Sequence, residues 1–234
     1  LRLLTVEIIK NWQWPIWNPY NGAGMPLMAI MHPGYFNPFG ALFIFLQPHI
    51  AWLLFIALQP IILGLSVYAY CRRICFDSMS SIFSAICLIF SGFVIARLEF
   101  GEFIYILSGL PLSLLMIEIA IDQKRSAILL FTPLLVLYIF LSGQPHMVIY
   151  VMLFTLCYAV YRYFQTTQDK KIIAGNFLIL GLLGFLGIGL AAFQLIPGLE
   201  LSLFSTINQA SSQFVFNRFL VPLSHLLSVL ILLV

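Results

Sequence analysis

The chain contains, at residues 49–71, the stretch HIAWLLFIALQPIILGLSVYAYC, which holds no Asp, Glu, Lys or Arg. A helix needs about 20 mostly apolar residues to cross the roughly 30 Å hydrocarbon core of a bilayer. This stretch is long enough, although Pro60 is expected to interrupt it. The fold class is therefore predicted to be all-α, a polytopic transmembrane helix bundle with about six complete spans. The further spans are predicted at residues 79–97, 103–121, 127–143, 144–164 and 172–197, with a truncated one at 219–234.

The composition excludes several other classes of protein. Only 19 of the 234 residues are charged (11 Lys and Arg plus 8 Asp and Glu), which is 8% of the chain, whereas 62% are hydrophobic. An average soluble domain has about 25% charged residues. An ordinary cytosolic enzyme, a disordered chain and a nucleic-acid-binding protein are therefore excluded. A transmembrane β-barrel is disfavoured because the apolar residues form continuous runs rather than alternating with polar ones.

The basic residues orient the spans. Loops rich in Lys and Arg stay on the cytoplasmic side, so residues 1–48, 97–102, 143–146 and 198–217 are expected on the extracytoplasmic side. The chain thus divides into an extracytoplasmic N-terminal region, residues 1–48, and a transmembrane region, residues 49–234. Seven of the 11 Lys and Arg follow the first, third and fifth predicted spans, namely Arg72, Arg73, Lys124, Arg125, Arg162, Lys170 and Lys171.

The N-terminal region predicts an aromatic loop at the membrane surface. It contains the segment WQWPIWNPYNGAGMP at residues 12–26, whose Asn-Pro and Gly-x-Gly steps favour tight turns. Trp and Tyr suit the head-group level, where a ring stays apolar while its polar atom reaches water. Residues 40–46 are too few to cross and predict an interfacial helix. The loop is either an ordinary aromatic anchor or a cap that binds substrate through Trp17, Asn18, Tyr20 and His32.

A second outside loop carries charged side chains. Glu99 and Glu102 would share one face of a helical turn, so they are weak candidates for general acid or base catalysis. Arg97, beside them, is a candidate for substrate binding. Two carboxylates alone under-ligate a divalent metal, so such a metal, the one cofactor considered, would need further oxygen ligands. The simpler interpretation is a solvated loop with an Arg–Glu pair.

Two more polar groups lie near predicted outer helix ends. Gln144 and His146 stand at a turn between two helices, where a helix N-terminus favours a phosphate contact, although a plain helical hairpin also explains the turn. Gln194 and Glu200 flank the outer end of the sixth span and are candidates for substrate binding. Glu118, within a span, is expected to reach toward the basic turn at Lys124 and Arg125. Small residues at positions 181, 184, 187 and 189 predict close helix packing.

In their order along the chain, these motifs resemble the bacterial YfhO family of polytopic membrane proteins. Members show a Trp-Asn-Pro-Tyr…Gly-x-Pro loop, an Asn-Pro step before a helix, a Leu-Ser-Gly-His-Pro-Gln-like turn and an Ala-x-Gln-x-x-Pro-x-x-Glu stretch. The polar pair of the turn is swapped in this chain, and Glu102 stands where relatives often have His. The matching residues are Trp17, Asn18, Pro19, Tyr20, Gly24, Pro26, Asn37, Pro38, Leu141–His146, Ala192, Gln194, Pro197 and Glu200.

The resemblance implies a glycosyltransferase of the multi-spanning GT-C type in a bacterial plasma membrane. Such enzymes take a sugar from a polyprenyl-phosphate carrier and transfer it on the outer face, here to a cell-envelope glycan or polymer. The resemblance also implies a catalytic Asp upstream of Trp17. Since the sequence begins without Met and ends within an apolar run, we expect that Asp in a missing N-terminal part. The alternatives are a transporter or flippase of lipid-linked saccharides and a non-catalytic membrane subunit.

Overall fold

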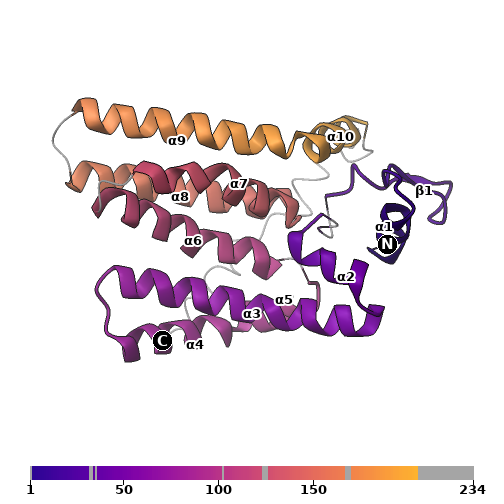
Figure 1. Ribbon diagram of the computed structural model, residues 1–234, viewed down its shortest axis with the longest axis horizontal. Coiled ribbons are helices and arrows are strands. Elements are labelled where there is room, and N and C mark those ends of the chain that lie inside the picture. The colour runs from indigo at the N-terminus through magenta and orange to yellow at the C-terminus, as the bar shows by residue number, and fades with distance from the viewer. Residues whose placement is uncertain are drawn as a thin grey trace, which may run out of the picture.

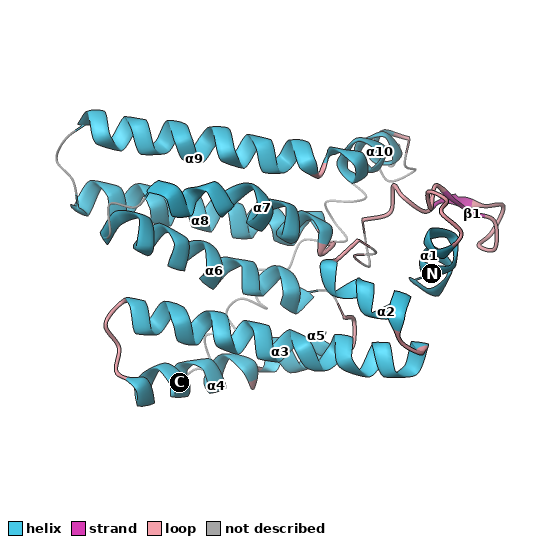
Figure 2. Cartoon of the chain, in the orientation of Figure 1, coloured by secondary structure: helices cyan, strands magenta, loops and turns pink. Residues whose placement is uncertain are grey.

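The computed structural model describes residues 2–31, 34, 36–101, 103–122, 126–166 and 170–204. Within this part the chain is all-α apart from one two-stranded hairpin, and its long helices lie side by side (Figures 1 and 2). In chain order the elements are α1 (Arg2–Lys10), β1 (Trp17–Asn18), β2 (Met25–Pro26), η1 (Pro38–Ala41), α2 (Leu42–Phe45), α3 (Pro48–Arg73), α4 (Ser78–Ile89), α5 (Gly92–Leu98), α6 (Phe103–Asp122), η2 (Ser126–Phe131), α7 (Thr132–Leu141), α8 (Pro145–Thr166), α9 (Lys170–Leu190) and α10 (Ala192–Leu203).

In the described part of the chain, three helices, α3, α6 and α8, are long and apolar enough to cross a membrane. They lie where spans were predicted at residues 49–71, 103–121 and 144–164. The prediction that Pro60 interrupts the first of them is wrong, because α3 continues through it. A proline removes one backbone hydrogen bond from a helix, but an apolar helix packed against neighbours tolerates that loss.

Two predicted spans are broken into bent helix pairs. The pair α4 and α5 bends by 52°, and Ser91 begins the second helix by accepting a hydrogen bond from the backbone N–H of Val94. The helices α9 and α10 bend by 72°, so the span predicted at 172–197 ends at Leu190. Glycines at 187 and 189 precede this bend and weaken the helix there. Counting each bent pair as one span gives up to five spans among the described residues.

The remaining predictions are met in part. Residues 127–143 form a 3₁₀ segment followed by the short helix α7, with Ile128–Leu141 below the length of a span. Short helical segments, η1 and α2, lie where an interfacial helix was predicted at residues 40–46. The N-terminal region, for which an aromatic loop was predicted, also contains the helix α1 at Arg2–Lys10. The last predicted span, residues 219–234, lies outside the described residues.

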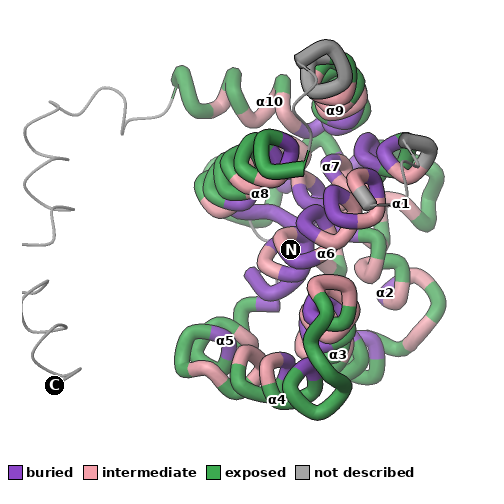
Figure 3. Tube along the Cα trace, turned by 90° about the vertical axis from the view of Figure 1, so that its left-hand side faces the viewer, coloured by how far each residue is buried: buried purple, intermediate pink, exposed green. Residues whose placement is uncertain are grey.

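Helix α6 forms the centre of the bundle. Helix α6 packs on α3 and on α8, while α9 packs on α7. Figure 3 shows the buried residues of α6 surrounded by the other helices. Ile104, Tyr105 and Ile106 have no exposed surface. The outer helix faces instead expose large apolar side chains, for example Leu53, Phe154 and Phe185. Apolar surface of this extent is unfavourable in water and is consistent with a multi-pass membrane protein.

Close helix approach depends on individual glycines rather than on a glycine stripe. A Cβ at Gly187 would lie 2.6 Å from the Cβ of Val136 in α7, so only glycine fits there. A Cβ at 181, 184 or 189 would meet nothing within 4 Å. The predicted small-residue packing in α9 therefore holds at one position of the four.

The helices alternate in direction, which gives the bundle two distinct ends. One end, here called the hairpin end, carries α1, α2, the β1–β2 hairpin and α10 (Figure 1). The other, the basic end, carries Arg72, Arg73, Arg162, Lys170 and Lys171 at or near helix termini. The segregation of charge predicted from the sequence is therefore present, with Lys124 and Arg125 outside the described residues.

Glu118 pairs with Arg162, whereas the basic turn that it was predicted to approach, Lys124 and Arg125, lies outside the described residues. Its carboxylate accepts hydrogen bonds from Nε and Nη2 of Arg162 at 2.5 and 2.6 Å, and from the Tyr158 hydroxyl at 2.5 Å. Arg162 and Glu118 lie in α8 and α6 at the same depth of the bundle, so they meet directly. A paired, hydrogen-bonded carboxylate can stay ionised in a low-dielectric setting.

Candidate functional site at the hairpin end

The β1–β2 hairpin is held by local hydrogen bonds. Trp17 pairs with Pro26, and Asn18 with Met25, in antiparallel register. Asn18 is buried, and its side-chain oxygen accepts a hydrogen bond from the backbone N–H of Tyr20 at 3.0 Å, which fixes the turn. Asn18 thus closes the turn of the hairpin, and the substrate-binding role predicted for it stays a prediction.

The aromatic side chains of this hairpin face outward. Gly24 has a φ of +100°, and a Cβ there would lie 2.5 Å from the Trp17 indole, so the ring rests directly on the glycine backbone. Trp17 remains half exposed and Tyr20 is 83% exposed. Two further rings of the segment, Trp12 and Trp14, are also exposed. Exposed Trp and Tyr at one end of an apolar bundle fit the head-group level of a membrane.

The chain after the hairpin crosses the end of the bundle. Its described residues between positions 27 and 41 are called the cap here. The Asn37 amide donates a 2.9 Å hydrogen bond to the Ser142 hydroxyl in the α7–α8 turn. A Cβ at Gly34 would lie 2.5 Å from the Ser142 carbonyl oxygen, so the two backbones touch. Phe39 stacks on Tyr105 with ring centroids 5.0 Å apart. These contacts join residues more than 60 positions apart in the chain and make the cap part of the fold.

Helix α10 packs against the same cap. Phe36 contacts Phe193 edge-on, with centroids 5.2 Å apart, and the Gly198 backbone approaches the Ala29 carbonyl oxygen and the Met31 side chain. Three of the predicted motifs, the aromatic loop, the Ser142 turn and the α10 segment, are therefore brought together.

A cleft of about 490 Å³ lies between the cap and α10. Its walls are apolar, and Glu200 is its one charged side chain among the described residues. Glu200 is exposed, so its carboxylate faces solvent at the edge of an apolar surface. The lining residues are Ile16, Pro26, Met28, Ala29, Pro197, Glu200, Leu201 and Phe204.

Gln194 lies on the same side of α10 as the cleft. It precedes Pro197 by three residues and Leu201 by seven, which is the spacing of one helix face. The side chain is 1% exposed, and neither its amide oxygen nor its nitrogen has a hydrogen-bond partner within the described residues. Buried amides are normally paired, and Gln194 is not among the residues that line the cleft.

The other predicted residues are dispersed. Gln144 is buried and has a φ of +43°, whereas His146 is exposed beside Tyr150, so the turn separates the two. Arg97 lies over the Phe103 ring at 4.7 Å, and no ion pair joins it to Glu99 among the described residues. His32 and Glu102 lie outside the described residues. No group of three or more His, Cys, Asp or Glu side chains that could hold a metal occurs in the described part.

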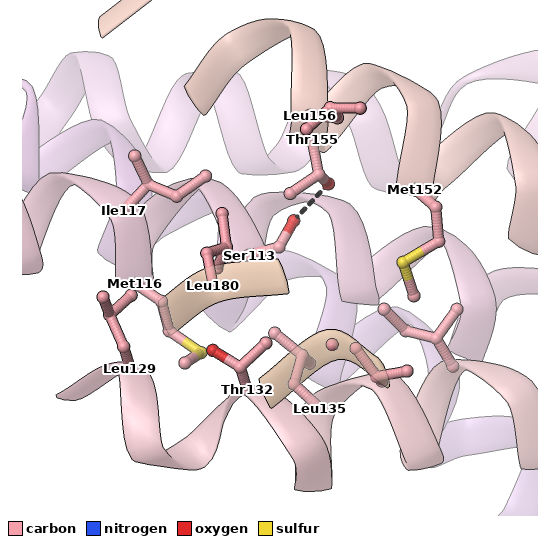
Figure 4. A pocket seen from close by; sticks show the side chains of 13 residues that line it. Ser113, Met116, Ile117, Leu129, Thr132, Leu135, Met152, Thr155, Leu156 and Leu180 are labelled. Atoms are coloured by element: carbon pink, nitrogen blue, oxygen red, sulfur yellow. Dashed lines mark hydrogen bonds between the residues drawn. The ribbon is translucent and has the colours of Figure 1, made fainter. Parts of the chain in front are cut away.

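A second cavity, of about 150 Å³, lies within the bundle among α6, α7, α8 and α9 (Figure 4). The Ser113 and Thr155 hydroxyls bond to each other at 2.7 Å across it, and the Thr132 hydroxyl has no partner within the described residues. Cavities of this size hold a molecule no larger than benzene. It is too small for a sugar and lies away from the polar residues of the hairpin end.

Comparison with models of known protein families, with curated proteins and with solved structures gives no match to this chain. Its function therefore has to be inferred from the chemistry of the site.

Proposed function

We propose that the chain is part of a membrane glycosyltransferase of the GT-C type, similar to the YfhO family, in a bacterial plasma membrane. In this proposal the hairpin end faces the extracytoplasmic side. The enzyme takes a sugar from a polyprenyl-phosphate donor and transfers it to a cell-envelope glycan or polymer. The observation that carries the proposal is the cleft between the cap and α10, since it joins two motifs of the resemblance, residues 17–26 and 192–200.

The chemistry of the cleft suits a sugar attached to a lipid. The Glu200 carboxylate can hydrogen-bond sugar hydroxyls, and exposed rings such as Trp17 can stack on a sugar face. The lipid tail stays in the bilayer beside the apolar walls. Arg97, exposed at the same end, supplies positive charge for the donor phosphate. Among the residues of this chain, Glu99 and Glu102 remain the candidates for the general base.

The rival is a transporter or flippase of lipid-linked saccharides. Its specific support is the pair of broken spans, bent by 52° and 72°, because discontinuous helices often form transport sites. The predicted interruptions at Pro60 and Pro133 do not support it, since α3 continues through Pro60 and Pro133 lies in the first turn of α7. A non-catalytic subunit is the third option.

Purified full-length protein in detergent, given a polyprenyl-phosphate sugar and an acceptor glycan, separates these functions. Sugar transfer is expected, and Glu200→Gln should reduce it by at least about tenfold, the effect of losing roughly 1.4 kcal/mol of interaction. The matched control is Glu7→Gln, which neutralises an exposed acid at the same end outside the cleft and should change little. If the wild-type protein transfers no sugar in detergent but moves a lipid-linked sugar across the membrane of vesicles, the flippase is favoured.

A further inference from the structure

The cavity of about 150 Å³ inside the bundle has no part in the function proposed above (Figure 4). It arises from the way α9 packs on α7. A Cβ on Gly187 would meet Val136 of α7, whereas a Cβ on Gly184, one turn earlier, would meet nothing within 4 Å. The two helices are therefore held close at Gly187 and leave a cavity beside Gly184, which is part of its lining.

The lining of this cavity is apolar except for three hydroxyl groups. Those of Ser113, Thr132 and Thr155 lie in the wall, and no charged side chain is found among the described residues of the lining. An apolar protein cavity of about 150 Å³ stays dry and binds a molecule the size of benzene. A charged molecule would lose its hydration there without a counter-charge. The cavity therefore suits a small, uncharged and mainly apolar molecule.

Two of the three hydroxyl groups use their hydrogens within the protein. The Ser113 hydroxyl donates to the carbonyl oxygen of Leu110 at 2.7 Å, so its single hydrogen is already engaged. The 2.7 Å hydrogen bond between Ser113 and Thr155 therefore has Thr155 as its donor. This pair joins α6 to α8 and offers no further hydrogen to a molecule in the cavity.

The third hydroxyl group, that of Thr132, differs from this pair. Thr132 is 9% exposed and points from α7 into the cavity, and its oxygen has no hydrogen-bond partner within the described residues (Figure 4). Buried hydroxyls are normally paired. A single water is a poor partner, since a buried water needs two to four polar neighbours and Thr132 is the one unpaired hydroxyl of the described lining.

We propose that this cavity binds an uncharged molecule about the size of benzene that carries one hydrogen-bond acceptor, which receives the hydrogen of the Thr132 hydroxyl. The apolar walls set the size and polarity of the molecule, and Thr132 sets the position of its acceptor. The thioether side chains of Met116 and Met152, both in the lining, can adapt to its shape. The site is separate from the Glu200 cleft, so it stands without the proposed sugar transfer.

The test uses nuclear magnetic resonance of isotope-labelled methionine methyl groups in the purified chain in detergent. Two ring molecules of matched size are titrated in at mildly alkaline pH: pyridine, which carries one acceptor and is uncharged there, and benzene, which carries none. The ring current of a bound molecule should shift the methyl resonances of Met116 and Met152 until the site is saturated. Met79 is the internal control, because it is 78% exposed and does not line the cavity.

Substitutions of Thr132 separate the hydroxyl from the shape of the side chain. Thr132→Val should weaken pyridine binding by roughly two- to tenfold, the effect of one neutral hydrogen bond, and leave benzene binding unchanged or tighter. Thr132→Ser keeps the hydroxyl and should retain most of the pyridine binding. The matched control is Thr166→Val, because Thr166 lies exposed at the end of α8 outside the cavity.

Saturable shifts of Met116 and Met152, with a loss on Thr132→Val that is confined to pyridine, support the site. Shifts that rise linearly and include Met79 would mean uptake of both molecules by the detergent and would overturn it. Absence of any shift would also overturn it, as would equal losses of pyridine and benzene on Thr132→Val. Far-UV circular dichroism shows whether each variant is folded, and Thr132→Ala gives the same comparison if Thr132→Val is not.

Discussion

The contact between α7 and α9 depends on the missing side chain of Gly187. In Gly187→Ala the new Cβ would lie 2.6 Å from the Val136 Cβ and 2.9 Å from the Pro133 carbonyl oxygen. The second atom belongs to the backbone, so the two helices have to move apart. Overpacking of this kind costs about 1–3 kcal/mol.

The matched control is Gly184→Ala, one turn earlier on the same helix. A Cβ there meets nothing within 4 Å, because Gly184 borders the cavity of Figure 4. Both substitutions gain the same helix propensity, about 0.5–1 kcal/mol, so the difference between them isolates the clash. The free energy of unfolding should therefore be lower for Gly187→Ala by about 1–3 kcal/mol.

Thermal unfolding of both variants in one detergent, followed by tryptophan fluorescence, measures this difference. For a domain of this size each 1 kcal/mol shifts the unfolding temperature by about 2–4 °C, so a gap of about 2–12 °C is expected. Gly184→Ala should unfold at or above the wild-type temperature. Equal unfolding temperatures for the two variants, or a lower one for Gly184→Ala, would refute the close α7–α9 contact.

Other contacts lead to further predictions. Asn37→Ala removes the buried hydrogen bond to Ser142 and should lower the free energy of unfolding by about 1–3 kcal/mol; exact additivity with Ser142→Ala in a double-mutant cycle would contradict it. Glu118→Gln breaks the ion pair between the buried Glu118 and the partly exposed Arg162 and should cost about 1–3 kcal/mol, between exposed and buried pairs; unchanged chemical denaturation would argue against the pair. Gly24→Ala should alter tryptophan emission far more than Gly22→Ala, which also has a positive φ but open space around its Cα; matching spectra would exclude the indole contact.

The sequence predicted the class of fold because a long apolar run has few alternatives. The stretch around α3 can satisfy its backbone in a membrane only as a helix, and the basic turns separate the two ends. The breaks at 90–91 and 191 were not predicted, because hydropathy is continuous across both. A bend depends on how neighbouring helices pack, and Gly187 shows this, since its role follows from Val136 in another helix.

The candidate site was predicted less completely than the fold. The sequence indicated Glu200 and the aromatic loop, but not that α10 turns by 72° to lie against that loop. It did not indicate that the Asn18 side chain closes the turn of the hairpin. Glu118 and Arg162 could have been paired from the sequence, since each is a charge within a predicted span at a similar distance from the basic turns.

Photocrosslinking of a lipid-linked sugar would locate the site most directly. A polyprenyl-phosphate sugar carrying a photoreactive group on the sugar is bound to the full-length protein, and labelled peptides are identified by mass spectrometry. Labels within residues 16–29 and 194–204, lost on competition with unmodified donor and reduced by Glu200→Gln, are the result expected from the cleft between cap and α10. Labels confined to peptides of the basic end, or labelling that unmodified donor does not displace, would contradict the proposed function.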